Sequence, residues 1–210
     1  MTRLEGHGKK RKNKISFLIA MNSEKRATIL RIAKKRFERF GFNKTTVDEI
    51  ANGANISKRT LYQEFENKGK ILEELFMFEA LSVRRAILNQ IKKVTEPAEK
   101  LQSYIRLAKK YLDQNPFIVN VLNDESGFFA PFLKEEPLLV EEGIEEIMVS
   151  ILREGVKKGV FRKMDEKIVG HSIFLLFKGF TYGRRDPDEQ IGTTQTNEFI
   201  NFVLHGILAR

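Results

Sequence analysis

The sequence contains no cysteine and no tryptophan, and only three of its 210 residues are histidine. The absence of cysteine excludes disulfides, thiolate metal sites and cysteine nucleophiles, and it fits a cytoplasmic protein. None of His7, His171 and His205 has another histidine at metal-ligand spacing, whereas a zinc site needs three or four protein ligands. We therefore predict no catalytic site, no metal and no cofactor, and we expect the isolated histidines to be hydrogen-bonded in a core or an interface.

The sequence also lacks the long apolar run of a membrane span, which needs roughly 18 uninterrupted residues. The basic residues 1–14 and the following ISFLIAM resemble the start of a secretory signal, but no small-residue cleavage site follows them. The stretch NKGK at 67–70 lacks the upstream glycine and the hydroxyl residue of a phosphate-binding loop. We expect a cytoplasmic protein that has no membrane partner and is not an enzyme.

Positive charge is concentrated in the first third of the chain. Residues 1–70 hold 18 Lys and Arg against 7 Asp and Glu, whereas residues 71–210 hold 19 against 21. This asymmetry indicates a polyanionic partner for the N-terminal part. The alternative is a basic tail that serves only solubility.

Apolar residues recur at spacings of three and four through the N-terminal part and predict three helices there. The first begins at Ser23, carries apolar residues from Ala27 to Phe40, and ends at Gly41, where a left-handed residue stops a helix with little strain. Thr46 and Glu49 have the spacing of a capping box at the start of the second helix. After a turn at 55–56, Ser57 can cap the third.

The third helix is short and mainly polar on its outer side. Leu61 and Phe65, four residues apart, anchor it to the core. Its outward residues are Lys58, Arg59, Thr60, Tyr62 and Gln63. Two helices joined by a short turn, the second polar outward, indicate a helix-turn-helix motif, whose second helix enters the major groove of DNA. There Arg59 can pair with a guanine and Gln63 with an adenine.

Further residues suit the phosphates of DNA. Lys44, Thr45 and Thr46 precede a helix N-terminus, where free N–H groups favour an anion, and Lys68 begins a fourth helix. The predicted DNA-binding set is Lys44, Thr45, Thr46, Ser57, Lys58, Arg59, Thr60, Tyr62, Gln63 and Lys68.

The rest of the chain also has helical periodicity, so the predicted fold is all-α with no strand. We expect a basic arm at 1–22, a three-helix helix-turn-helix domain at 23–68 and a larger helical domain for ligand binding and dimerisation at 69–210. Asn115-Pro116 breaks one helix, and an irregular stretch precedes the next, which covers 138–156. The two last helices are apolar around much of their circumference, which is typical of a central core or of an interface.

Residues 29–76, from ILRIAKKRFERFGF to KGKILEELF, resemble the TetR family of bacterial transcriptional regulators. The markers include Gly41, Thr46, Ala51, Tyr62 and Lys68. Asn55 stands where the family usually has a turn glycine, and Arg59 stands where a small residue is common. The resemblance implies a homodimer, a variable C-terminal ligand domain and repression that a small molecule relieves.

The resemblance also implies a dimer interface on the two last helices, to which we assign Ile173, Phe180, Phe199, Phe202 and Val203. The alternative is that these helices are only core.

Aromatic residues without a charge cluster suggest a mainly apolar or aromatic effector. The candidate pocket residues are Tyr104, Tyr111, Phe128, Phe129, Phe132, Phe174 and Phe177, although each could be ordinary core. Asp124 and Glu125 could supply a carboxylate for a cationic ligand. The acidic residues Glu141, Glu142, Glu145 and Glu146 are interpreted as solvated helix faces.

These features together predict a dimeric repressor of the TetR type that binds palindromic operator DNA and a small-molecule effector. The first alternative is a helical module that binds another protein through its C-terminal helices. The second is a DNA-organising or division-control protein of the same fold without an effector.

We expect the deletion of residues 1–20 to weaken binding to all DNA sequences and to flatten its salt dependence, because each phosphate contact releases counterions. Mobility shift at several salt concentrations measures both effects. A deletion variant with an unchanged salt slope would show that the basic arm does not contact DNA.

Overall fold

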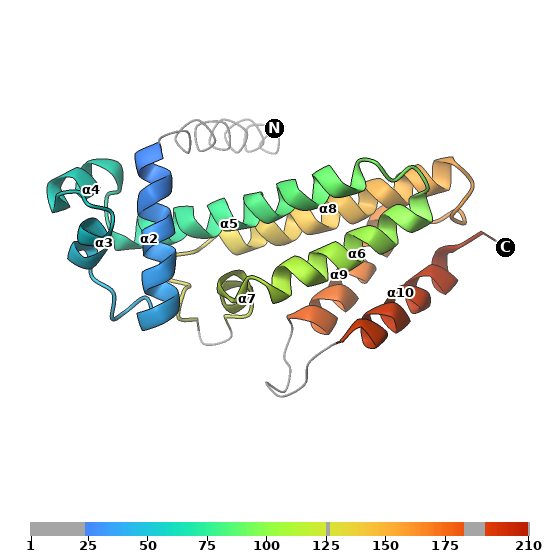
Figure 1. Cartoon of the computed structure of the whole chain (residues 1–210). Coiled ribbons are helices and arrows are strands. Elements are labelled where there is room, and N and C mark those ends of the chain that lie inside the picture. Colours follow the sequence, from blue (N-terminus) through green and yellow to red (C-terminus); the bar gives the residue numbers. More distant parts are fainter. Residues whose placement is uncertain (1–23, 125–126, 183–191, 210) are drawn as a thin grey trace, which may run out of the picture. The chain divides into compact units, whose positions relative to one another are not determined.

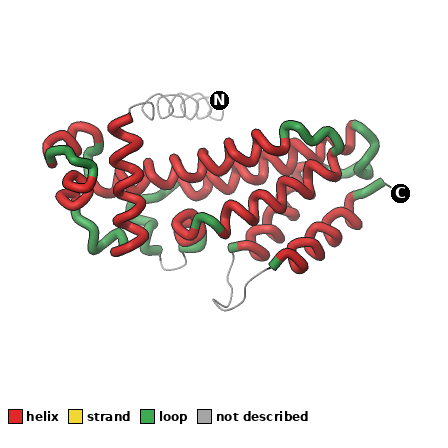
Figure 2. The backbone as a smooth tube through the Cα atoms, viewed as in Figure 1, coloured by secondary structure: helices red, strands yellow, loops and turns green. Residues whose placement is uncertain are grey.

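The computed structural model describes residues 24–124, 127–182 and 192–209, and within these ranges the chain is built from helices and turns (Figures 1 and 2). The described residues contain no strand, and an isolated antiparallel bridge joins Phe161 to Leu208. The all-α prediction is therefore confirmed. The predicted basic arm, the Ser23 cap and Glu125 lie outside the described residues.

The chain divides into two compact units, of which the first ends at Leu75 and the second begins at Phe76. The first unit contains α2 (Glu24–Phe40), α3 (Val47–Gly53), α4 (Lys58–Glu64) and the start of α5 (Lys68–Ile91). The end of α2 and the starts of α3 and α4 lie where the sequence predicts. Gly41 has φ +81°, the capping box of Thr46 and Glu49 forms, and Ser57 caps α4.

The core of the first unit contains apolar side chains from all four helices. Its buried residues include Ile29, Leu30, Ala33, Phe37, Phe42, Ile50, Ala51, Leu61, Phe65, Ile71, Leu72 and Leu75. The sequence places Phe40 on the apolar face, but this ring is 41% exposed. Phe40 is the last residue of α2 and lies beyond the end of the core, where the guanidinium groups of Arg36 and Arg39 stack on its ring.

The second unit contains the rest of α5 and five further helices: α6 (Pro97–Asp113), α7 (Pro116–Leu122), α8 (Glu136–Lys157), α9 (Glu166–Thr181) and α10 (Thr193–Ile207). In it α6, α8 and α9 pack on one another, and α10 packs on α6. The sequence does not predict α7. Pro116 begins this helix at its first turn, where the missing N–H costs nothing, and four apolar side chains bury it.

Small residues permit close packing along α8. A Cβ added to Gly155 would lie 2.0 Å from the ring of Phe161, so only glycine admits this buried ring. A Cβ on Gly170 of α9 would lie 2.5 Å from the Val149 side chain on α8.

Among the described residues, no helix is both long and apolar enough to span a membrane.

Candidate functional sites

The short helix α4 presents a polar surface on an apolar anchor. Leu61 and Phe65 are only 0% and 2% exposed. The turn before α4 contains Asn55 at φ +55°, a left-handed conformation that asparagine adopts more readily than most residues. The predicted outward residues Lys58, Arg59, Tyr62 and Gln63 are exposed, and Thr60 is half-buried. The cap residue Ser57, which also belongs to the predicted DNA-binding set, is exposed. The exposed Arg, Lys, Gln and Tyr side chains can form hydrogen bonds with base edges and phosphates.

Lys58 already has a partner in the first unit. Its ammonium lies 2.9 Å from the carboxylate of Asp48 in the first turn of α3. The hydrogen bond to Asp48, together with the carboxylate charge, raises the pKa of Lys58. Both side chains are more than half exposed, so the pair is weak, and a DNA phosphate could replace the carboxylate.

The three residues predicted to contact phosphate before α3 differ in their exposure and in their hydrogen bonds. Lys44 is exposed, but Thr45 is buried, and its hydroxyl donates a hydrogen bond to the Gly41 carbonyl. Thr46 is occupied by the capping box, in which Glu49 accepts from its backbone N–H at 2.8 Å. This hydrogen bond is the main cause that lowers the pKa of Glu49.

The Lys68 ammonium donates hydrogen bonds to the carbonyls of Phe42 and Thr45, each at 2.9 Å, and lies over the Phe42 ring. Partial burial lowers the pKa of Lys68. The geometry therefore shows Lys68 and Thr45 stabilising the loop between α2 and α3. Contact of the whole predicted set with DNA stays a prediction.

Arg26, which the sequence analysis did not select, supports the C-terminal end of α4. Its guanidinium bonds to the Glu74 carboxylate on α5 and to the Glu64 carbonyl, and it lies 4.1 Å from the ring centroid of Phe65. Glu74 is 48 positions further along the chain, so no local pattern could reveal the pair.

The predicted effector residues fall into two groups in the second unit. Tyr104, Phe174 and Phe177 are buried between helices, and the Tyr104 hydroxyl donates to the Ile144 carbonyl at 3.1 Å. Burial raises the pKa of Tyr104. Tyr111 is half-buried on α6. The others, Phe128, Phe129 and Phe132, belong to the loop between α7 and α8 and are exposed or half-buried. A role for either group in binding an effector stays a prediction.

Two acidic residues have structural partners. The Asp124 carboxylate accepts hydrogen bonds from the backbone N–H groups of Phe128 and Phe129, which closes the loop after α7. The interpretation of Glu141 as part of a solvated helix face is wrong, because its side chain is only 14% exposed. One of its oxygens accepts from the Tyr182 hydroxyl at 3.2 Å and from the Lys178 ammonium at 2.7 Å. Burial and the Glu141 charge together raise the pKa of Tyr182.

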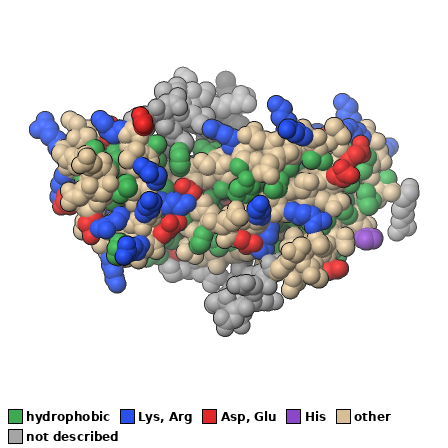
Figure 3. All heavy atoms as spheres, in the orientation of Figure 1, with side chains coloured by type: hydrophobic (Ala, Val, Ile, Leu, Met, Phe, Trp, Pro, Cys, Tyr) green, Lys and Arg blue, Asp and Glu red, His purple; other side chains and the backbone are tan. Residues whose placement is uncertain are grey.

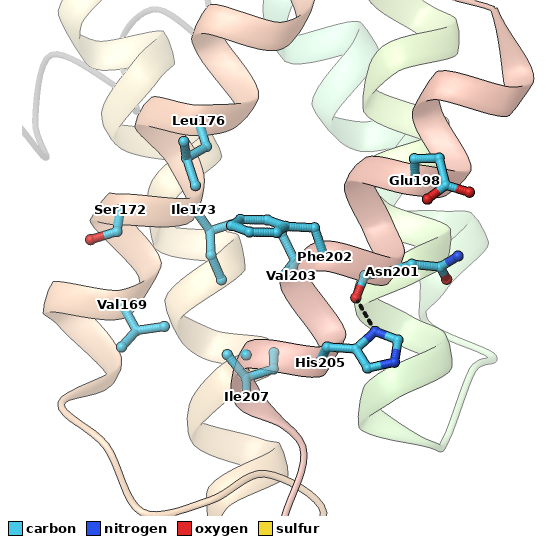
Figure 4. A pocket seen from close by; sticks show the side chains of 11 residues that line it. Val169, Ser172, Ile173, Leu176, Glu198, Asn201, Phe202, Val203, His205 and Ile207 are labelled. Carbon is cyan, nitrogen blue, oxygen red and sulfur yellow. Dashed lines mark hydrogen bonds between the residues drawn. The ribbon is translucent and has the colours of Figure 1, made fainter.

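An apolar face lies along α9 and α10 (Figure 4). This face contains an open pocket of about 710 Å³. Side chains of both helices line it, among them Val169, Ile173, Leu176, Phe202, Val203 and Ile207. Of the residues predicted for an interface, Phe202 is 68% exposed, Ile173 and Val203 are buried in the chain itself, and the half-buried rings of Phe180 and Phe199 stack at 4.8 Å.

The two histidines in the described residues are exposed and hydrogen-bonded. His205 lies on the α9–α10 face, with Nδ1 2.7 Å from the Asn201 carbonyl (Figure 4). His171 Nδ1 lies 2.9 Å from the Glu145 carboxylate. Neither is a core residue in the single chain.

The fold and the α4 surface define a helix-turn-helix transcriptional regulator. The family model of bacterial regulatory proteins of the tetR family matches residues 29–75, and the model of the tetracyclin repressor-like C-terminal domain matches residues 94–181. The HTH-type transcriptional repressor KstR2 of Mycolicibacterium smegmatis is 30% identical over 196 residues, which are 88% of this chain and 91% of that protein. The chain belongs to the TetR family of transcriptional regulators.

Solved structures share the fold at lower identity. A regulator from Saccharomonospora viridis in complex with choline is 19% identical, with a TM-score of 0.69 over 90% of this chain and 100% of that one. The regulator FadR from Bacillus subtilis in complex with stearoyl-CoA is 20% identical, with a TM-score of 0.66 over 86% of this chain and 98% of that one. At these identities the likeness shows the fold alone.

The geometry predicts different outcomes for Lys68→Gln and Arg59→Gln. Lys68→Gln should lower the free energy of unfolding by about 1–3 kcal/mol, because part-buried carbonyls lose a charged donor. The exposed Arg59→Gln should change stability by less than about 0.5 kcal/mol. It should instead weaken DNA binding by about 1–3 kcal/mol and relax the preference at one base pair.

Chemical denaturation and mobility shift measure the two effects separately. Unchanged stability of the Lys68→Gln variant would contradict the loop-stabilising role. Unchanged base preference of the Arg59→Gln variant would contradict readout by Arg59.

Proposed function

We propose that this TetR-family regulator is a repressor that binds a palindromic operator as a homodimer and is released by a small, mainly apolar or aromatic effector. The observation that carries the proposal is α4, whose exposed Arg59, Tyr62 and Gln63 stand on a helix anchored by buried Leu61 and Phe65. Regulators of this family bind operator DNA. A dimer with one such helix per protomer suits two half-sites about one helical turn apart.

The exposed apolar face of α9 and α10 supports the homodimer. Ile168 and Phe202 are 66% and 68% exposed, and Leu175 and Leu176 are about half exposed. Contiguous apolar patches on a soluble surface mark interaction sites. A second copy related by a two-fold axis would cover the same patch on both chains at once. Phe202, the most exposed of these four side chains, would then be central to the interface.

The effector is proposed from the aromatic residues of the second unit. Buried Tyr104, Phe174 and Phe177 lie among helices, and the Tyr104 hydroxyl, which donates its proton to the Ile144 carbonyl, can still accept a hydrogen bond from a ligand. Neighbours with this fold hold stearoyl-CoA or choline, so the fold accommodates unlike ligands. The apolar side chains favour an uncharged effector over a cationic one, because the Asp124 carboxylate is already bonded to backbone N–H groups.

The alternatives are a DNA-organising protein of the same fold without an effector and a module that binds another protein through α9 and α10. A sequence-selective dimer that a small molecule releases would exclude both.

Selection of bound sequences from random duplex DNA, scored by mobility shift at two salt concentrations, tests the operator and the dimer. The wild-type protein should select a palindrome. Phe202→Glu should yield monomers in analytical ultracentrifugation and lower operator affinity at least about tenfold, because it places a charge in the proposed apolar interface. The matched control Leu138→Glu, which changes a leucine on α8 that is 61% exposed, should do neither. A dimeric Phe202→Glu variant, or binding without a consensus, would count against the proposal.

Thermal shift against fatty acyl, aromatic and cationic compounds tests the effector. An apolar or aromatic compound should stabilise the protein by about 2.7 kcal/mol at a concentration one hundred times its Kd, because it binds only the folded state. The same compound should release the protein from its operator in a mobility shift. Stabilisation by sugars or small anions alone would contradict the proposed ligand class.

A further inference from the structure

The solvent face of α2 carries a row of three basic side chains. Arg31, Lys35 and Arg39 follow one another at intervals of four residues, and all three are exposed. Four residues make slightly more than one turn, so successive side chains lie nearly in line, about 6 Å apart along the axis. The buried residues of α2 lie on its opposite side, and Lys and Arg side chains gather over this helix in Figure 3.

The other basic side chains of α2 have acidic partners. Arg26 bonds to Glu74, Arg36 lies 2.5 Å from Glu49, and Lys34 lies 3.9 Å from Glu38, the acidic residue beside the row.

The three residues of the row differ from these. Over residues 24–124, 127–182 and 192–209, neither Arg31 nor Lys35 forms an ion pair, and Arg39 stacks on the Phe40 ring. The row therefore presents three charges that the described part of the chain does not neutralise.

Such a row weakens the isolated helix. Like charges at i and i+4 repel each other, whereas the protein elsewhere sets an acid at this spacing, as in Lys109–Asp113 and Glu154–Lys158. An unneutralised row of this kind fits a polyanion, because phosphates supply the missing negative charge. Arginine at two of the three positions adds donors that can bind a phosphate through two hydrogen bonds.

We propose that Arg31, Lys35 and Arg39 form a second, sequence-independent contact surface for the phosphate backbone of duplex DNA. The surface binds a segment other than the half-site read by α4, because the row lies on the side of α2 opposite to the buried residues through which this helix packs on the first unit. The three charges cover about 12 Å, and phosphates of one strand follow at about 3.4 Å along the duplex axis. The inference rests on the proposed DNA-binding function.

The test compares the full-length protein with its triple variant Arg31→Gln, Lys35→Gln, Arg39→Gln. Binding is measured against salt concentration on two duplexes, one that ends just outside the selected palindrome and one with long flanks. On the long duplex the slope of log K against log salt should fall by about 0.9 for each lost phosphate contact, up to about 2.7 per protomer. The slope on the short duplex and the selected sequence should not change.

The matched control is Lys157→Gln, Lys163→Gln, Lys167→Gln, which removes three exposed charges from the second unit and should leave both slopes unchanged. The row variant should unfold no earlier than the wild type at low salt, since its substitutions remove a repulsion. This result separates lost contacts from lost folding.

An unchanged slope on the long duplex, an equal fall on the short one or an equal fall in the control would overturn the inference alone. A wild-type protein that binds neither duplex would overturn the proposed function as well.

Discussion

The burial of Leu61 and Phe65 is the interaction on which the polar outer surface of α4 depends. A helix as short as α4 is not stable in water by itself, because nucleation costs more than a few hydrogen bonds return. Its exposed polar side chains add nothing to the core. The two buried side chains, the Ser57 cap and the Arg26 guanidinium on Phe65 therefore hold it in place. A change in any of them would move every outward side chain of α4 together.

The two units expose different kinds of surface, one charged and one apolar. The first exposes charge, and many of its basic groups are held by acidic or carbonyl partners, as Lys58 is by Asp48 and Lys68 by the loop carbonyls. The second exposes apolar side chains along α9 and α10, which water solvates poorly. Charge on the first surface suits a polyanion such as DNA, whereas the apolar second surface is suited to contact with protein.

Features that depend only on residues a few positions apart could be predicted from the sequence. The capping box of Thr46 and Glu49 and the Ser57 cap depend on residues within a few positions, and both form as predicted. The predicted turn at 55–56 also forms, with Asn55 in the left-handed conformation. Features that depend on distant residues could not. Glu141 looks like one more solvated acid until α9 brings Tyr182 and Lys178 to it, 41 and 37 positions later.

The same distinction separates the two candidate sites. The outward residues of α4 follow from helical spacing, which is a local property, and the structure exposes four of the five. The aromatic residues of the second unit have the same pattern whether they line a ligand or fill a core. Their separation into a buried group and a loop group follows from how α6, α8 and α9 pack, which no single stretch of sequence contains.

The pair between Lys58 and Asp48 has a consequence for how fast such a protein could leave wrong DNA. In the proposed DNA complex Lys58 would move to a phosphate, and the Asp48 carboxylate would lose its partner and face a polyanion. The attraction from the lysine is then offset by repulsion from the aspartate, so a contact with backbone alone gains little. Only at a site where base contacts add to the phosphate contacts would binding outweigh the loss of the Lys58–Asp48 pair. In the proposed complex the Asp48 carboxylate would therefore weaken non-specific binding more than binding to the operator.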